Sequence, residues 1–154
     1  MRPLADRHYT RQKIGARQFV PPGRCLVLRS ACGRAYWVTS WPFRYVKHAW
    51  PGAWVCSAFR NEGAGLSSAL ILSAIAATRT MWPDPEEHGL ITFVNADKVR
   101  HKRDPGRCFL RAGFVDVGYT VGGLVALLLP LARLHFVTPT APGALNRHFL
   151  GQCR

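Results

Sequence analysis

Short apolar runs separated by turn residues dominate the hydrophobic pattern of this chain, and one longer stretch has helical spacing. Runs rich in Val, Ile and aromatic residues predict β-strands at residues 24–30, 35–41, 54–59 and 89–95. Apolar side chains recur at helical spacing over residues 66–82, and Pro83 ends this helix. Gly122 and Gly123 lie between two further runs, residues 114–120 and 124–129, which predicts a hairpin.

Two local features complete the expected set of elements. Residues 31–34 are expected to form a hairpin turn between the first two strands. A short helix is expected over residues 104–112, with Asp104 as its N-cap, Pro105 at its first position and Gly113 as its C-cap. Residues 42–52, bounded by prolines, are a loop or a short helix.

The order of these elements predicts a single α+β domain, with a mixed, mostly antiparallel sheet flanked by a few helices. The first 23 residues are polar and basic and close at Pro21-Pro22-Gly23, so residues 1–23 are expected to form a basic arm. The domain itself is placed at residues 24–132. Periodicity fades after residue 132, and residues 133–154 are expected to form a poorly ordered tail.

The segment from Trp54 to Ser68 combines a strand, a glycine-containing turn and the start of the long helix. Gly63 and Gly65 would let the backbone approach a ligand closely, and Ser67 or Ser68 is expected to cap the first helical turn. N–H groups at a helix start attract anions, and Arg60 adds a positive charge. A phosphate or carboxylate site is therefore expected from Arg60 and Asn61 to Ser68, although plain turn chemistry, with Asn61 stabilising the turn, explains these residues equally well.

Charge is unevenly distributed: the chain has a net charge of +13. Residues 1–34 contain eight basic residues against one acidic, and residues 98–111 contain six against one. Clustering of this kind indicates a polyanionic partner such as DNA or RNA, with a solvated basic surface as the alternative. The expected phosphate contacts are made by Arg11, Lys13, Lys47, Lys98, Arg100, Lys102, Arg103 and Arg107.

The five cysteines are scattered without a C-x-x-C pair, which argues against a disulfide framework and a zinc ribbon. Cys56, in an apolar strand, is expected in the core and not as a nucleophile. No apolar run is long enough to span a bilayer, and the basic N-terminus lacks the apolar stretch of a signal peptide. We therefore expect a soluble protein of the cytoplasm, the host cytoplasm if it is phage-encoded, with no membrane partner.

Aromatic residues and one histidine stand around the third strand. The aromatic side chains either form core or stack on nucleic-acid bases; they are Trp37, Trp41, Phe43, Tyr45, Trp50 and Trp54. His48 is a candidate general base, because its ring titrates near neutrality and the neighbouring Lys47 disfavours the imidazolium. Ordinary packing of this histidine beside tryptophans is the alternative.

The element order, the Arg60-Asn61-Glu62-Gly63-x-Gly65 turn before the main helix and the Arg111-x-Gly113-Phe114 motif before a closing strand resemble the GNAT acyltransferase superfamily. The resemblance covers roughly residues 24–130. It implies that the strand–turn–helix binds the pyrophosphate of a donor, usually an acyl-coenzyme A. The cofactor-binding residues would be Arg60, Asn61, Gly63, Gly65, Ser67 and Ser68.

A narrower resemblance is to the phage Mom-type DNA-modification branch. It rests on His8-Tyr9-Thr10, on Phe59-Arg60-Asn61 with Ser67, on Thr92-Phe93-Val94-Asn95 and on residues 107–114. Proteins of this branch convert adenines in phage DNA to a carbamoylmethyl form, which shields the genome from restriction, and are associated with iron. The resemblance implies that His8 and Tyr9 act in catalysis or hold iron, that the donor is an acyl-coenzyme A or another acyl or aminoacyl donor, and that the partner is double-stranded DNA with a flipped base.

Two departures from that pattern affect the expected chemistry. Asn95 stands where the branch has Asp, so a carboxylate is missing, although Asp97 can substitute if the strand ends differently. Phe109 stands where a tyrosine would donate a proton.

From the resemblances and the charge pattern together, we expect a DNA-modifying transferase acting on the exocyclic amine of adenine. An acetyl-coenzyme A-dependent N-acetyltransferase acting on a small amine or protein, or a non-catalytic nucleic-acid binder, is the alternative.

Overall fold

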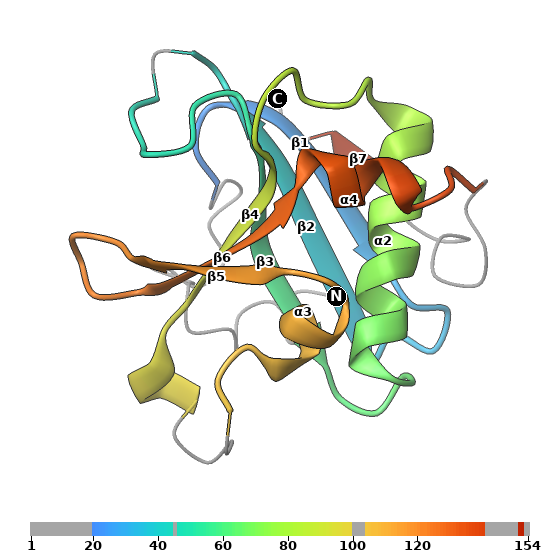
Figure 1. Cartoon of the computed structure of the whole chain (residues 1–154). Coiled ribbons are helices and arrows are strands. Elements are labelled where there is room, and N and C mark those ends of the chain that lie inside the picture. The colour runs from blue at the N-terminus through green and yellow to red at the C-terminus, as the bar shows by residue number, and fades with distance from the viewer. Residues whose placement is uncertain (1–19, 45, 100–103, 141–150, 153–154) are drawn as a thin grey trace.

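Within residues 20–44, 46–99, 104–140 and 151–152, which the computed structural model describes, seven strands form one mixed sheet (Figure 1). The strand order is β5-β6-β4-β3-β2-β1-β7, in which β7 (Gly151–Gln152) pairs with β1 at one edge. All neighbouring strands are antiparallel except β3 and β4. This architecture confirms the expected α+β class with a mostly antiparallel sheet.

The first three strands form an antiparallel meander. They are β1 (Gly23–Arg29), β2 (Ala35–Pro42) and β3 (Trp54–Asn61). The turn over residues 31–34 closes the first hairpin, because the Ser30 N–H donates to the Ala35 carbonyl at 2.9 Å and the Gly33 N–H donates back to Ser30. The predicted strands and turn are therefore confirmed, with the ends shifted by one or two residues.

The predicted long helix is α2 (Ser67–Met81). Ile71, Ala74 and Ile75 are buried on its inner face, and Pro83 follows its end. These side chains pack in one core cluster with Trp37 and Trp54 of the sheet. The expectation that these two tryptophans form core is thereby confirmed, whereas Phe43 is exposed. Tyr45 lies outside the described residues.

After α2 the chain enters the sheet again as β4 (Gly89–Val94), which lies parallel to β3. It is followed by a short 3-10 helix, η1 (Ala96–Val99), and by α3 (Arg107–Arg111). Asp104 was predicted as the N-cap of α3, which is wrong: Gly106, in a left-handed conformation, precedes the helix, and no side chain caps it. At the other end the C-cap is Ala112 and not Gly113 as predicted; Gly113 follows it with a φ angle of +100°, and the Gly113 and Phe114 N–H groups donate to the carbonyls of Leu110 and Phe109.

The predicted second hairpin consists of β5 (Val115–Tyr119) and β6 (Val125–Pro130). The Thr120 N–H donates to the Leu124 carbonyl and closes the loop that contains Gly122 and Gly123. β6 pairs with β4 on its other side, so the later strand of the hairpin lies inside the sheet and β5 forms its edge.

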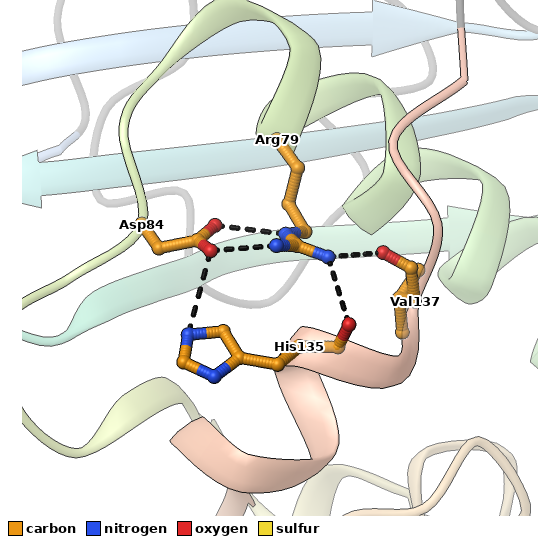
Figure 2. Close-up of polar contacts among 4 residues, drawn as sticks. All are labelled: Arg79, Asp84, His135 and Val137. Carbon is orange, nitrogen blue, oxygen red and sulfur yellow. Dashed lines mark hydrogen bonds and ion pairs between the residues drawn. The ribbon is translucent and has the colours of Figure 1, made fainter.

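A last helix, α4 (Leu131–Phe136), was not anticipated and crosses the expected boundary between domain and tail. Leu134 of α4 is buried in the same cluster as α2. Figure 2 shows how α4 is held: Arg79 of α2 donates two hydrogen bonds to Asp84 and two more to the carbonyls of His135 and Val137. The His135 ring lies 3.5 Å from the same carboxylate.

No disulfide joins the described cysteines, Cys25, Cys32, Cys56 and Cys108. Cys56 is buried, as expected, and burial raises the pKa of its thiol well above the ordinary value. Among the helices described, none is both long and apolar enough to cross a membrane.

Candidate functional site

The parallel strands β3 and β4 pair only over their first half. Cα partners run from Trp54 and Leu90 to Cys56 and Thr92, after which β3 continues to Asn61 and β4 to Val94 without further pairing between them. The divergence follows a β-bulge: Val38 pairs with Ala58 and Thr39 with Cys56, so Ser57 is an extra residue on β3. Beyond Cys56, the edge of β3 that faces β4 makes no described ladder bonds.

Asn61 organises the turn that joins β3 to α2. Its Oδ1 accepts from the Ala64 N–H at 2.8 Å, and its Nδ2 donates to the Gly65 carbonyl at 2.7 Å and to the Ser67 hydroxyl at 2.9 Å. A single side chain therefore fixes both ends of the loop. The sequence allowed Asn61 to be either a turn stabiliser or a ligand contact. These hydrogen bonds confirm that Asn61 stabilises the turn.

The two glycines of this turn have positive φ angles, +85° at Gly63 and +150° at Gly65. The space where a side chain of Gly63 would lie is bordered by the Arg34 guanidinium, 3.8 Å away. Arg60 lies on the same turn and forms an ion pair with Glu62, with 2.8 Å between Nε and Oε1. The negative charge of Glu62 partly offsets the positive charge expected from Arg60.

The predicted helix cap is wrong. Leu66 occupies the N-cap position of α2, no side chain bonds the first turn, and the Ser67 hydroxyl instead accepts from Asn61. Because the first turn also contains no acidic residue, its N–H groups and the positive end of the helix dipole face the glycine loop without a competing side chain. The anion site at this turn stays a prediction, which would depend on these N–H groups and not on a serine cap.

Asn95 and Asp97 lie just past the end of β4. Since β3 and β4 are parallel, these residues and Asn61 lie at the same edge of the sheet, the lower edge in Figure 1. The Asn95 Oδ1 accepts from the backbone N–H groups of Asp97 and Lys98, at 3.1 and 3.2 Å, and so begins η1. The residue that stands in place of a family carboxylate thus has a structural role, and Asp97 is exposed beside it.

Two exposed basic residues of the second basic segment also lie on this edge. Lys98 is in η1, and Arg107 begins α3 and lies 3.7 Å from the Asp104 carboxylate in a solvent-exposed ion pair. Phe109, in contrast, points into the core and stacks edge-on against Phe114 and Phe59, with ring centroids 5.3 and 6.0 Å apart. A tyrosine hydroxyl at this position would therefore be placed among aromatic rings.

His48 lies at the opposite end of β3, in the loop that leads into this strand. Its Nδ1 accepts from the Trp50 N–H at 3.2 Å, so the neutral ring carries its hydrogen on Nε2, and its basic nitrogen, Nδ1, is occupied by the backbone hydrogen bond. The pKa of His48 is lowered by partial burial and then by the nearby His88, and not by Lys47 as the sequence suggested. The prediction that His48 is a general base is not supported by this geometry.

Seven predicted site residues lie outside the described residues, so the structure places none of them: His8, Tyr9, Arg11, Lys13, Arg100, Lys102 and Arg103. The expected iron ligands are among them. Among the residues that are described, no group of His, Cys, Asp or Glu side chains is arranged to hold a metal ion.

Sequence reasoning missed two residues beside the turn, Cys32 and Arg34. The Cys32 thiol is exposed, and its pKa is lowered to about 7 by the Ser30 hydroxyl, 3.4 Å away, and by Arg34. No local sequence pattern indicates this placement, because it depends on the register of β2 with β3, which sets Ala35 opposite Asn61 and brings Arg34 to the glycine loop. The Glu62 N–H donates to the Arg34 carbonyl at 2.7 Å.

Comparisons with known proteins give no relative: no family model matches the chain, and neither a curated protein nor a solved structure resembles it significantly.

Proposed function

We propose that this chain is a GNAT-like transferase that modifies DNA, with the exocyclic amine of adenine as the acceptor. The observation that carries the proposal is the β3–turn–α2–β4 unit, in which a glycine turn opens toward a helix start at the point where two parallel strands diverge. Ligands of sheets with parallel strands bind at the carboxyl ends of those strands, and Asn61 and Asn95 mark these ends.

The donor is assigned to this unit. A pyrophosphate would bind the N–H groups of the glycine loop and the first turn of α2, with the guanidinium of Arg34 beside it. The acyl arm of coenzyme A is an extended chain that carries amide groups. These amides can form hydrogen bonds with the edge of β3 beyond Cys56, in the way that an added strand would. Another acyl or aminoacyl donor with a phosphate group would fit the same turn.

The acceptor is inferred from charge. Residues 1–34 contain eight basic residues and one acidic, and residues 98–111 contain six basic residues and one acidic. Lys98 and Arg107 of the described part lie on the same edge as the donor turn and would contact phosphates. Because the adenine amine faces the major groove within a duplex, access requires that the base is flipped out.

The transfer would form a bond between the adenine nitrogen and the acyl carbon, break the bond from that carbon to the donor sulfur, and release the donor as a thiol. A base must take the proton of the amine. Asn95 cannot do so, because an amide is not a base near neutrality, and we assign this step to Asp97, the exposed carboxylate at this edge.

Two alternatives each have an observation in their favour. The glycine turn before α2, which offers N–H groups to a pyrophosphate, fits an acetyl-coenzyme A-dependent transferase acting on a small amine or protein equally well. The amide of Asn95 and the buried ring of Phe109 fit a non-catalytic nucleic-acid binder, since neither can transfer a proton.

Mass spectrometry of nucleosides from host DNA tests the proposal, after expression of the wild type and of Arg34→Gln, His8→Ala and Asp97→Asn. Arg133→Gln serves as a charge-matched control, because Arg133 is exposed and bonds only the Gly113 carbonyl among the described residues. We expect an adenine adduct in the wild type and in the control, and its loss or strong reduction in the other variants.

Binding of coenzyme A and of DNA by the purified protein separates the alternatives. Unmodified DNA together with tight, salt-sensitive DNA binding and no donor binding would establish the non-catalytic reading. Unmodified DNA with coenzyme A binding that Arg34→Gln weakens, and weak DNA binding, would establish the small-amine acetyltransferase.

A further inference from the structure

A cavity of about 700 Å³ lies at the end of the sheet opposite the Asn61 turn. It is lined by the start of β1, the end of β2, the loop that leads into β3 and the loop after α2, which lie toward the top of Figure 1. Because β3 has eight residues, the cavity and the turn are separated by about 26 Å along the strand. The cavity is within the size range of small-molecule sites and is separate from the proposed donor site.

Arg24 lines this cavity with an exposed side chain that lies beside Trp41. It pairs in register with Trp41, and its guanidinium carbon lies 5.4 Å from the centre of the Trp41 ring. The indole is itself fixed, because its Nε1 donates to the Gly52 carbonyl at 3.0 Å and its ring packs against Trp82. No described carboxylate pairs with Arg24. A cation–π contact leaves the N–H groups of a guanidinium available to an anion, and the planar fork of these groups suits phosphate.

A second donor lines the same cavity. The neutral His48 ring carries its hydrogen on Nε2, since Nδ1 accepts from the Trp50 N–H. Arg44 also lines the cavity, and its pair with Glu86 at 3.8 Å is almost fully exposed, so it contributes little energy and is easily exchanged for another partner. The cavity therefore supplies several donors and positive charge, with the carboxylate of Glu86 close to Arg44.

The remaining lining suits a planar ring with N–H groups. Phe43 is 53% exposed and offers an apolar ring, while the carboxylates of Glu86 and Glu87 can accept hydrogen bonds. Nucleotides combine these properties, since they carry a phosphate, an aromatic ring and ring amino groups.

We propose that this cavity binds a nucleotide, with the phosphate on Arg24 and His48, the base against Phe43, and the amino groups of the base on Glu86 and Glu87. The shared chemistry is that of a nucleoside monophosphate, either free or as an unstacked nucleotide of a nucleic-acid strand. The site does not depend on the proposed transfer reaction or on its donor.

Calorimetric titration of the full chain with AMP tests this site, with adenosine and ribose 5-phosphate as partial ligands. The variants are Arg24→Gln and, at the Asn61 turn, Arg34→Gln, with Arg133→Gln as the charge-matched control. We expect AMP to bind the wild type and both Arg34→Gln and Arg133→Gln alike, and Arg24→Gln at least tenfold more weakly. Each partial ligand should also bind at least tenfold more weakly than AMP.

Several results would overturn the proposal. The first two are a failure of AMP to bind at millimolar concentration and equal binding of AMP by the wild type and Arg24→Gln. The other two are loss of AMP binding in Arg34→Gln alone and binding of ribose 5-phosphate as tightly as AMP. Circular dichroism establishes that each variant is folded. A single-stranded oligonucleotide that competes with AMP for the wild type identifies a strand as the source of the nucleotide, whereas AMP binding without such competition identifies a free nucleotide.

Discussion

At the scale of single residues, the candidate site is shaped by two short polar side chains that form hydrogen bonds with the backbone. Asn61 fixes the turn between β3 and α2, and Asn95 begins η1 in the same manner. The two asparagines mark the ends of two parallel strands. Their amides contribute structure, so proton transfer at this edge depends on other groups.

Replacing Asn61 by Ala is expected to lower the free energy of unfolding by about 1–3 kcal/mol, because three hydrogen bonds are lost and the Ala64 N–H loses its acceptor. Urea denaturation measures the change. Ser68→Ala is the matched control and should change stability by less than about 0.5 kcal/mol, since the predicted Ser68 cap does not form. Equal effects of the two substitutions would contradict the role of Asn61.

Cys32 should be the most reactive of the described cysteines. Its pKa of about 7, set by the Ser30 hydroxyl and then by Arg34, makes about half of the thiol ionised at neutral pH. The alkylation rate of the peptide containing Cys32, followed by mass spectrometry between about pH 5 and 9, should rise with a midpoint near pH 7. Arg34→Gln should move this midpoint upward, and the buried Cys56 should stay unmodified in the native protein. A midpoint near the ordinary cysteine pKa in the wild type would show that the neighbours do not act.

At the scale of elements, the least expected contact is the attachment of α4 to α2. Arg79 bonds the carboxylate of Asp84 and the last carbonyls of α4, so one guanidinium joins a helix, a loop and the segment after β6. Figure 2 shows the Arg79 side chain reaching Asp84 and the carbonyls of His135 and Val137 at once. The loss of periodicity after residue 132 concealed this helix, because Leu134 is its single buried side chain.

This attachment should weaken in acid. Arg79 lowers the pKa of Asp84 below its unfolded value, so the folded state binds fewer protons than the unfolded state in that range. The stabilising contribution is present above the unfolded pKa of about 3.9 and is lost as the pH falls through the lower folded pKa. The difference in urea midpoint between wild type and Asp84→Asn should therefore be largest near neutrality and shrink below about pH 4. A difference that is the same at all pH values would exclude this ion pair as its cause.

At the scale of the whole molecule, the excess positive charge lies mostly in segments outside the described residues, and Lys98 and Arg107 extend it onto one edge of the sheet. If this edge binds DNA, the logarithm of the binding constant should fall steeply with the logarithm of salt concentration. Fluorescence anisotropy of a labelled duplex at several salt concentrations measures the slope. Lys98→Gln and Arg107→Gln should each reduce it by about 1, while Arg133→Gln leaves it unchanged. A slope near zero for the wild type would contradict a DNA partner.

The sequence by itself determined the elements and the class of fold. The strands, helix α2 and both hairpins follow from local periodicity and from turn residues such as Gly113 and the Gly122-Gly123 pair. The sequence indicates these elements directly, because the interactions that form them join residues close together in the chain. It also located the glycine turn at Asn61, because strand, glycines and helix are contiguous there.

Only the tertiary structure decided which of these features meet. The pairing of β4 with β6, the divergence of β3 from β4, the position of Arg34 over Gly63 and the attachment of α4 all join residues far apart in the chain. The tertiary structure also places His48 and Asn61 at opposite ends of β3. The Trp50 N–H bonds Nδ1 of His48, which leaves Nε2 as the hydrogen-bond donor of the neutral ring. Such relations follow from strand order and packing, and a pattern of neighbouring residues carries no information on either.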